Sequence, residues 1–131
     1  MKILLIDDDE ELCSELKEVL TAEGFEVDAS FDGLHGLSLL RQKKYHMIIL
    51  DLRLPGLNGY KVLKSIRSEF KELKVLVLSG RPLGEPILQE DGVSQDEEEK
   101  TLHLADGVVN KPCRVDALLE KIKALSVVDK G

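Results

Sequence analysis

Short apolar runs alternate with segments of helical periodicity along the chain. Residues 2–6, apolar after Lys2, and residues 47–50 and 75–78 are short apolar runs. This pattern is typical of strands buried on both faces. Residues 25–29 alternate in polarity and predict a more exposed strand. Residues 108–109 form the core of a short fifth strand. The pattern therefore predicts five strands.

Apolar residues at helical spacing lie between these runs. Gly24 is a plausible C-terminal stop for the first such segment. The positions that define the helices are Leu12, Leu16, Val19 and Leu20; Leu34, Leu37 and Leu40; Val62, Leu63, Ile66 and Phe70; and Val115, Leu118, Leu119, Ile122 and Leu125. Strands that alternate with helices predict an α/β fold with a doubly wound parallel sheet and helices on both faces.

The length and the net charge of the chain limit the expected number of domains and the classes of ligand. A chain of 131 residues is expected to form one domain. A formal net charge of −7 repels phosphate backbones, so we expect no direct nucleic-acid binding. No apolar run is long enough for a membrane span, and no signal peptide is recognisable. We expect a cytoplasmic protein in which Cys13 and Cys113 are reduced thiols.

Polar residues follow four of the predicted strands. Asp7 and Asp8 follow the first, Asp51 the third, Ser79 the fourth and Lys111 the fifth. The carboxyl ends of parallel strands meet at one edge of the sheet, where ligands bind in this class of fold. We therefore expect these five side chains to converge on one crevice.

The acidic run after the first strand has two interpretations. Asp9, Glu10 and Glu11 fit the start of a helix, where acids cap free amides and favour the dipole. Capping does not account well for Asp7 and Asp8, which leave the strand end as adjacent carboxylates. We therefore assign a functional role to Asp7 and Asp8.

Three close carboxylates repel unless a cation intervenes. Mg²⁺ takes oxygen ligands and binds through one or two carboxylates plus a phosphate. Ser79 and Lys111 could surround a phosphoryl group, and Asp51 could attack it to form an acyl phosphate. The histidines, at positions 35, 46 and 103, lack metal-ligand spacing, and no glycine-rich nucleotide loop is present.

Taken together, these residues resemble the receiver domain of bacterial two-component response regulators over residues 2–127. The motifs are the acidic pair, Asp-x-x-x-Pro-Gly-x-x-Gly after the third strand, Ser after the fourth and Lys-Pro after the fifth. The resemblance implies a flavodoxin-like strand order 2-1-3-4-5. It also implies one receiver domain over residues 1–131.

The same resemblance implies a role for each matching residue. Asp51 is the phosphoacceptor, and Asp7, Asp8, Asp51 and the backbone carbonyl of Arg53 hold Mg²⁺. Ser79 and Lys111 bind the phosphoryl group and take part in switching. The side chains of Arg53 and Arg81 are candidates for tuning the lifetime of the acyl phosphate.

The sequence departs from the family pattern after the fourth strand. Residues 80–95 are atypically long, and a capping box predicts a helix from Gln95 with Leu104 and Ala105 among its few apolar anchors. Val108 stands where the family usually has an aromatic residue, and Cys113 replaces a phenylalanine. We therefore expect residues 81–113 to contact the output partner. Deleting residues 83–92 should then alter partner binding and leave acyl-phosphate formation intact.

The leading hypothesis is a phosphoryl-accepting switch, served by a histidine kinase, rather than an enzyme with its own metabolite. The alternative is a receiver-like module that docks a partner without phosphorylation. A haloacid-dehalogenase-type phosphatase is disfavoured because the residue after its Asp-x-Asp pair is missing and no cap domain fits. A flavin-binding domain is disfavoured because the first strand is not followed by a hydroxyl-rich phosphate loop.

Overall fold

The computed structural model describes residues 1–54, 57–79, 103–110 and 114–126. Its main sheet has five parallel strands in the order β2-β1-β3-β6-β7. Numbered among themselves, these strands follow the predicted order 2-1-3-4-5. The strands are β1 (Lys2–Ile6), β2 (Glu26–Ser30), β3 (Met47–Asp51), β6 (Lys74–Ser79) and β7 (Gly107–Asn110).

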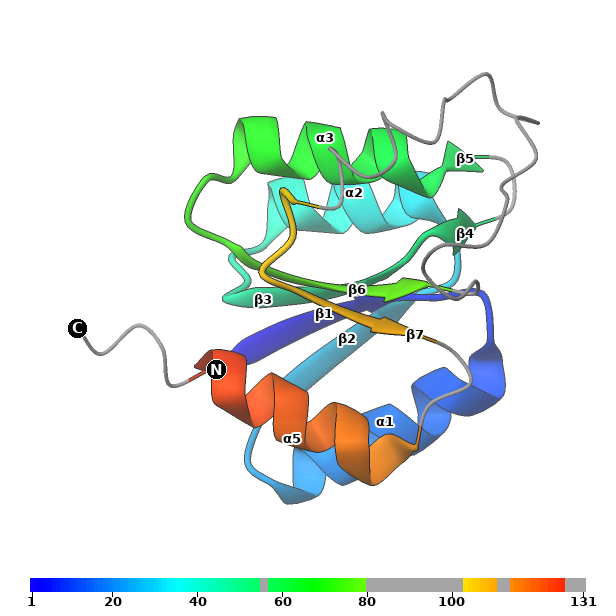
Figure 1. Ribbon diagram of the computed structural model, residues 1–131, viewed down its shortest axis with the longest axis vertical. Coiled ribbons are helices and arrows are strands. Elements are labelled where there is room, and N and C mark those ends of the chain that lie inside the picture. Colours follow the sequence, from blue (N-terminus) through cyan, green and yellow to red (C-terminus); the bar gives the residue numbers. More distant parts are fainter. Residues whose placement is uncertain (55–56, 80–102, 111–113, 127–131) are drawn as a thin grey trace.

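Helices cover both faces of this sheet (Figure 1). The helices α2 (Gly33–Gln42) and α3 (Gly59–Glu69) lie on one face. The helices α1 (Glu10–Ala22) and α5 (Val115–Ser126) lie on the other. The doubly wound α/β fold is therefore confirmed. Among the described residues, no helix combines the length and hydrophobicity needed to cross a membrane.

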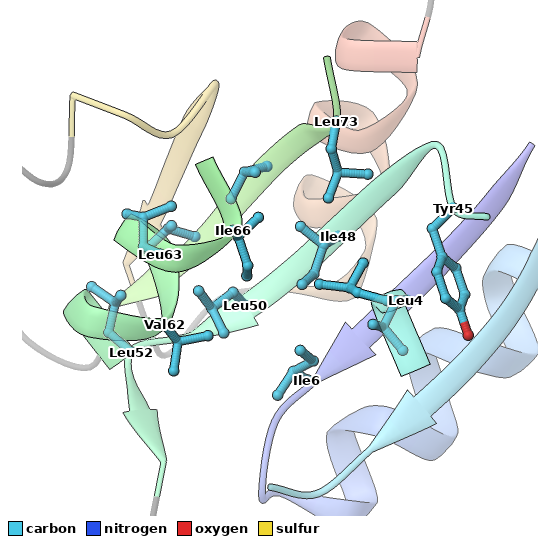
Figure 2. Packing of buried hydrophobic residues seen from close by; sticks show 13 residues of the cluster. Leu4, Ile6, Tyr45, Ile48, Leu50, Leu52, Val62, Leu63, Ile66 and Leu73 are labelled. Atoms are coloured by element: carbon cyan, nitrogen blue, oxygen red, sulfur yellow. The ribbon is translucent and has the colours of Figure 1, made fainter. Parts of the chain in front are cut away.

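Alternate residues of the central strands enter two separate cores. Leu4, Ile48 and Val75 point toward α2 and α3, and Figure 2 shows Leu4 and Ile48 in that layer. Their neighbours Leu5 and Ile49 join the core beneath α1 and α5. Side chains packed on both faces explain why these strands are apolar without alternation.

The first helix ends as its sequence predicts. Gly24 has a φ of 95°, a left-handed conformation that glycine adopts without the cost of a Cβ. Its amide donates to Thr21 O (3.0 Å), and the amide of Phe25 donates to Leu20 O (3.0 Å). These two bonds form a Schellman motif, which satisfies carbonyls left free at the helix end.

Two details differ from the sequence-based expectation. A short antiparallel hairpin, formed by β4 (Arg53–Leu54) and β5 (Leu57–Asn58), follows β3, where the sequence pattern predicts no strand. Residues 103–106 form turns and bends, so Leu104 and Ala105 do not lie in a helix as predicted. Both nevertheless pack against the core beside α3. The predicted helix start at Gln95 lies outside the described residues.

Candidate functional site

Three carboxylates meet at the carboxyl edge of the sheet. Asp7, Asp8 and Asp51 each offer an oxygen, and these oxygens lie within 4.8 Å of one another. The strand register explains this, because Ile6 pairs with Leu50 and the next residue on each strand is an acid. The convergence that the sequence predicts is confirmed for these three residues.

The members of this acid cluster differ in exposure. Asp51 is 2% exposed and Asp7 is fully buried. Asp8 is exposed. The cluster therefore has a buried floor and an open side, which suits a site that a ligand enters from solvent.

Asp7 is held by its backbone and by its side chain. Its amide donates to Ser30 O in β2 (3.1 Å), and its Oδ1 accepts from the Asp9 amide (2.9 Å). The Cys13 thiol in α1 donates to the Asp7 carbonyl (3.4 Å). The contacts with Ser30 and Cys13 depend on tertiary packing, so local sequence does not indicate them.

The neighbouring acids have the capping role that the sequence predicts. Asp9 is the N-cap of α1, and its side chain accepts from the Leu12 amide (3.1 Å). Glu10 and Glu11 lie in the first turn of the helix. The separation of the acidic run into capping residues and cluster residues is therefore confirmed in geometry.

Asp51 is the last residue of β3 and pairs with Leu78 of β6. The next amide, that of Leu52, still donates to Leu78 O (3.1 Å). Pairing with β6 thus holds the backbone both at Asp51 and at the residue after it.

Gly59, the last residue of the motif that begins at Asp51, allows α3 to lie close to the backbone after Asp51. It begins α3, and a Cβ at this position would lie 2.6 Å from the carbonyl carbon of Leu52. Only glycine permits this approach of α3 to the residue after Asp51. The close approach is set by the β4–β5 hairpin between Leu52 and Gly59, which the sequence pattern does not predict.

Of the other predicted site residues, the structure describes Ser79 and Arg53 but not Lys111 or Arg81. Ser79 is the last residue of β6 and pairs with Asn110, so its backbone lies at the same edge as Asp51. Lys111 follows Asn110 directly but lies outside the described residues, as do Arg81 and Cys113. Arg53 lies in β4, where it pairs with Asn58.

The donor set fits a hard divalent cation. It consists of carboxylate oxygens alone, and two of the three carboxylates are buried where their charges repel. Mg²⁺ prefers oxygen ligands and retains part of its water, which the open side at Asp8 allows. Within the described ranges, this is the one cluster of three or more His, Cys, Asp or Glu suited to a metal ion.

His35 and His46 make hydrogen-bond contacts within the fold. His35 Nδ1 lies 2.9 Å from Ser30 Oγ. His46 Nδ1 accepts from the Lys2 amide (3.0 Å). His103 is exposed.

The response regulator receiver domain family matches residues 3–123. The regulatory protein VanRB of Enterococcus faecalis is 31% identical over 127 residues, covering 95% of this chain and 52% of VanRB. The chain thus spans about half the length of this curated relative.

Solved structures agree with this match. The response regulator TrrA of Thermotoga maritima, in complex with Mg²⁺-BeF, is 31% identical with a TM-score of 0.75, over 95% of this chain and 97% of TrrA. TrrA in complex with the histidine kinase ThkA matches at 30% identity, a TM-score of 0.75 and the same coverage. The chain belongs to the response regulator receiver domain family of two-component systems.

Proposed function

We propose that the chain is a single receiver domain over residues 1–131 in which Asp51 accepts a phosphoryl group from a histidine kinase. The observation that carries this proposal is the meeting of Asp51, Asp7 and Asp8 within 4.8 Å at the open edge of the sheet. The complexes of TrrA with Mg²⁺-BeF and with ThkA support it. The domain is a cytoplasmic switch rather than an enzyme for a metabolite.

In the proposed reaction, a carboxylate oxygen of Asp51 attacks the phosphorus of a phosphohistidine. The P–N bond breaks as the new P–O bond forms, and the departing imidazole takes up a proton. The buried backbone around Asp51 holds the nucleophile still, which lowers the entropic cost of alignment.

Asp7, Asp8, Asp51 and the carbonyl of Arg53 are the proposed ligands of Mg²⁺. When bound, the ion neutralises charge on the phosphoryl oxygens and on the carboxylates. Ser79 and Lys111 are the proposed donors to the phosphoryl group. The Arg53 and Arg81 side chains are proposed to influence how long the acyl phosphate lasts, since each follows a site residue by two positions.

We assign partner recognition to residues 81–113, where the sequence departs from the family pattern. Within the described part of this segment, Val108 pairs with Val77 and is partly buried against the core that includes α3. An aliphatic side chain in this place could not reproduce the rotation of an aromatic ring, so the output is expected to differ from the family's usual one.

The direct test is intact mass after incubation with acetyl phosphate and MgCl₂. We expect the mass of one phosphoryl group to be added to wild type. The addition should not occur when EDTA is present during the incubation, or in Asp51→Asn. Asp116→Asn is the matched control, because that exposed acid in α5 lies outside the cluster. A wild-type chain that stays unmodified would instead favour docking without phosphorylation.

A further inference from the structure

Two large hydrophobic side chains project into solvent beside the acid cluster. Phe31 is 45% exposed and Leu34 is 69% exposed, and Met1 is the other large hydrophobic exposed in the described part of the chain. Phe31 lies between β2 and α2, and Leu34 lies in the first turn of α2. We call these two residues the Phe31–Leu34 patch. A single exposed hydrophobic residue is ordinary, but two within four consecutive residues suggest a contact surface.

The patch faces outward because the other side of α2 is packed against the sheet. Gly33, Gly36 and Leu40 are the buried positions of the helix. A Cβ at Gly36 would lie 2.8 Å from Cγ1 of Ile6, so the helix backbone rests directly on the end of β1. Rotating α2 to bury Leu34 would break this contact.

The patch adjoins the acid cluster through the β1–β2 pairing. Ile6 pairs with Ser30, and the Asp7 amide donates to Ser30 O (3.1 Å). Phe31 is the next residue after Ser30. The backbone of Phe31 therefore lies beside that of Asp7, at the carboxyl edge of the sheet. Figure 1 shows β1 and β2 side by side in this sheet.

Hydrogen bonds fix the segment that carries the patch. Ser30 Oγ donates to Asp32 O (2.9 Å) and lies 2.9 Å from His35 Nδ1. The Asp32 side chain accepts from the His35 amide (2.8 Å) as the N-cap of α2. A surface held in this way before binding loses little conformational entropy on contact.

We infer that the Phe31–Leu34 patch is a contact for the histidine kinase during phosphoryl transfer, an inference that rests on the proposed function. Transfer to Asp51 brings the donor histidine to bonding distance of a carboxylate that is 2% exposed. The kinase surface around that histidine must then cover the adjoining edge of the sheet. Exposed aromatic and aliphatic side chains there supply the apolar contacts that are typical of interface centres.

The experiment compares two phosphodonors on the variant Phe31→Ala/Leu34→Ala. Acetyl phosphate with MgCl₂ needs no protein surface, so its rate should stay within about twofold of wild type. The second donor is a histidine kinase. Each histidine kinase of the source organism is purified, autophosphorylated with radiolabelled ATP and tested in turn. For the kinase that labels wild type, transfer at low receiver concentration should fall about tenfold or more. Gln42→Ala, at the far end of α2, is the matched control and should change neither rate.

The outcomes separate the two proposals. Equal kinase transfer to wild type and variant overturns the inference and leaves the proposed function standing. A matched fall with both donors also overturns it, because the patch would then act on the site itself. No labelling of wild type by either donor removes the proposed function and the inference together. A wild-type dimer that becomes a monomer in the variant, seen by sedimentation, assigns the patch to a second copy and overturns the inference.

Discussion

The guanidinium of Arg67 in α3 is bonded to the carboxylate of Asp106, 39 positions away (Nη2 to Oδ2, 3.0 Å). The same oxygen of Asp106 accepts from the Val75 amide at the start of β6 (2.8 Å). The other bonds of this guanidinium go to the carbonyls of Leu104 (2.9 Å), Lys71 (3.0 Å) and Leu73 (2.9 Å). Arg67 thus ties the segment entering β7 to α3 and β6.

Arg67→Ala should lower the free energy of unfolding by about 2 kcal/mol, because several partly buried acceptors lose their donor together. Urea unfolding followed by circular dichroism measures this. Arg41→Ala is the matched control, since its ion pair with Glu69 (2.7 Å) is exposed and should contribute little. Equal effects of the two substitutions would argue against a special role for Arg67.

Gly59→Ala should destabilise the fold by about 1–3 kcal/mol through overpacking, because its Cβ would overlap the backbone of Leu52. The displacement should also weaken Mg²⁺ binding, since Leu52 follows Asp51 directly. Gly24→Ala provides the comparison: its Cβ meets nothing within 4 Å, and its cost of about 1 kcal/mol comes from the positive φ alone. Gly24→Ala should leave Mg²⁺ binding unchanged.

The acid cluster should make Mg²⁺ a stabilising ligand. Three carboxylates within 4.8 Å repel in the absence of a cation, so MgCl₂ should raise the urea midpoint of wild type. Asp8→Asn should lower the apparent Mg²⁺ affinity about tenfold and leave stability without Mg²⁺ equal or higher. A variant that responds to MgCl₂ as wild type does would contradict the assignment of Asp8 as a ligand.

Acid sensitivity should arise at the edge strand β2. The Tyr45 hydroxyl donates to Asp28 Oδ2 (2.6 Å), and this bond, helped by Lys43 and Lys2, lowers the pKa of Asp28 below its ordinary value of 3.8. A lowered pKa in the folded state stabilises the fold above the ordinary value, and this contribution is lost as the pH falls through the folded-state pKa.

Tyr45→Phe removes the largest cause of that shift. The stability difference between wild type and Tyr45→Phe should therefore be larger at pH 6 than at pH 3, which urea unfolding at both pH values can measure. A constant difference would mean that Tyr45 acts through packing alone.

The sequence predicted those features that depend on strand order and local periodicity. The sequence predicts that Asp7 and Asp51 lie close together, because each directly follows a buried apolar run and parallel strands end at one edge of the sheet. The N-cap at Asp9 and the helix end at Gly24 depend only on residues close by in the sequence, so the sequence pattern predicts both.

Features that depend on the meeting of distant side chains could not be predicted. Nothing near Arg67 in the sequence indicates Asp106, 39 positions away, as its partner. Leu104 was wrongly placed in a helix, because its burial beside α3 comes from tertiary packing rather than helical periodicity.

The hydrogen bond from Leu52 to Leu78 has a consequence for how a signal can leave the site. It extends the pairing of β3 with β6 past Asp51, so the backbone at Asp51 opens only when these two strands separate. The backbone of Asp51 therefore cannot report phosphorylation by local opening. The response is therefore expected from groups that reorganise around an aspartate whose backbone stays in the sheet.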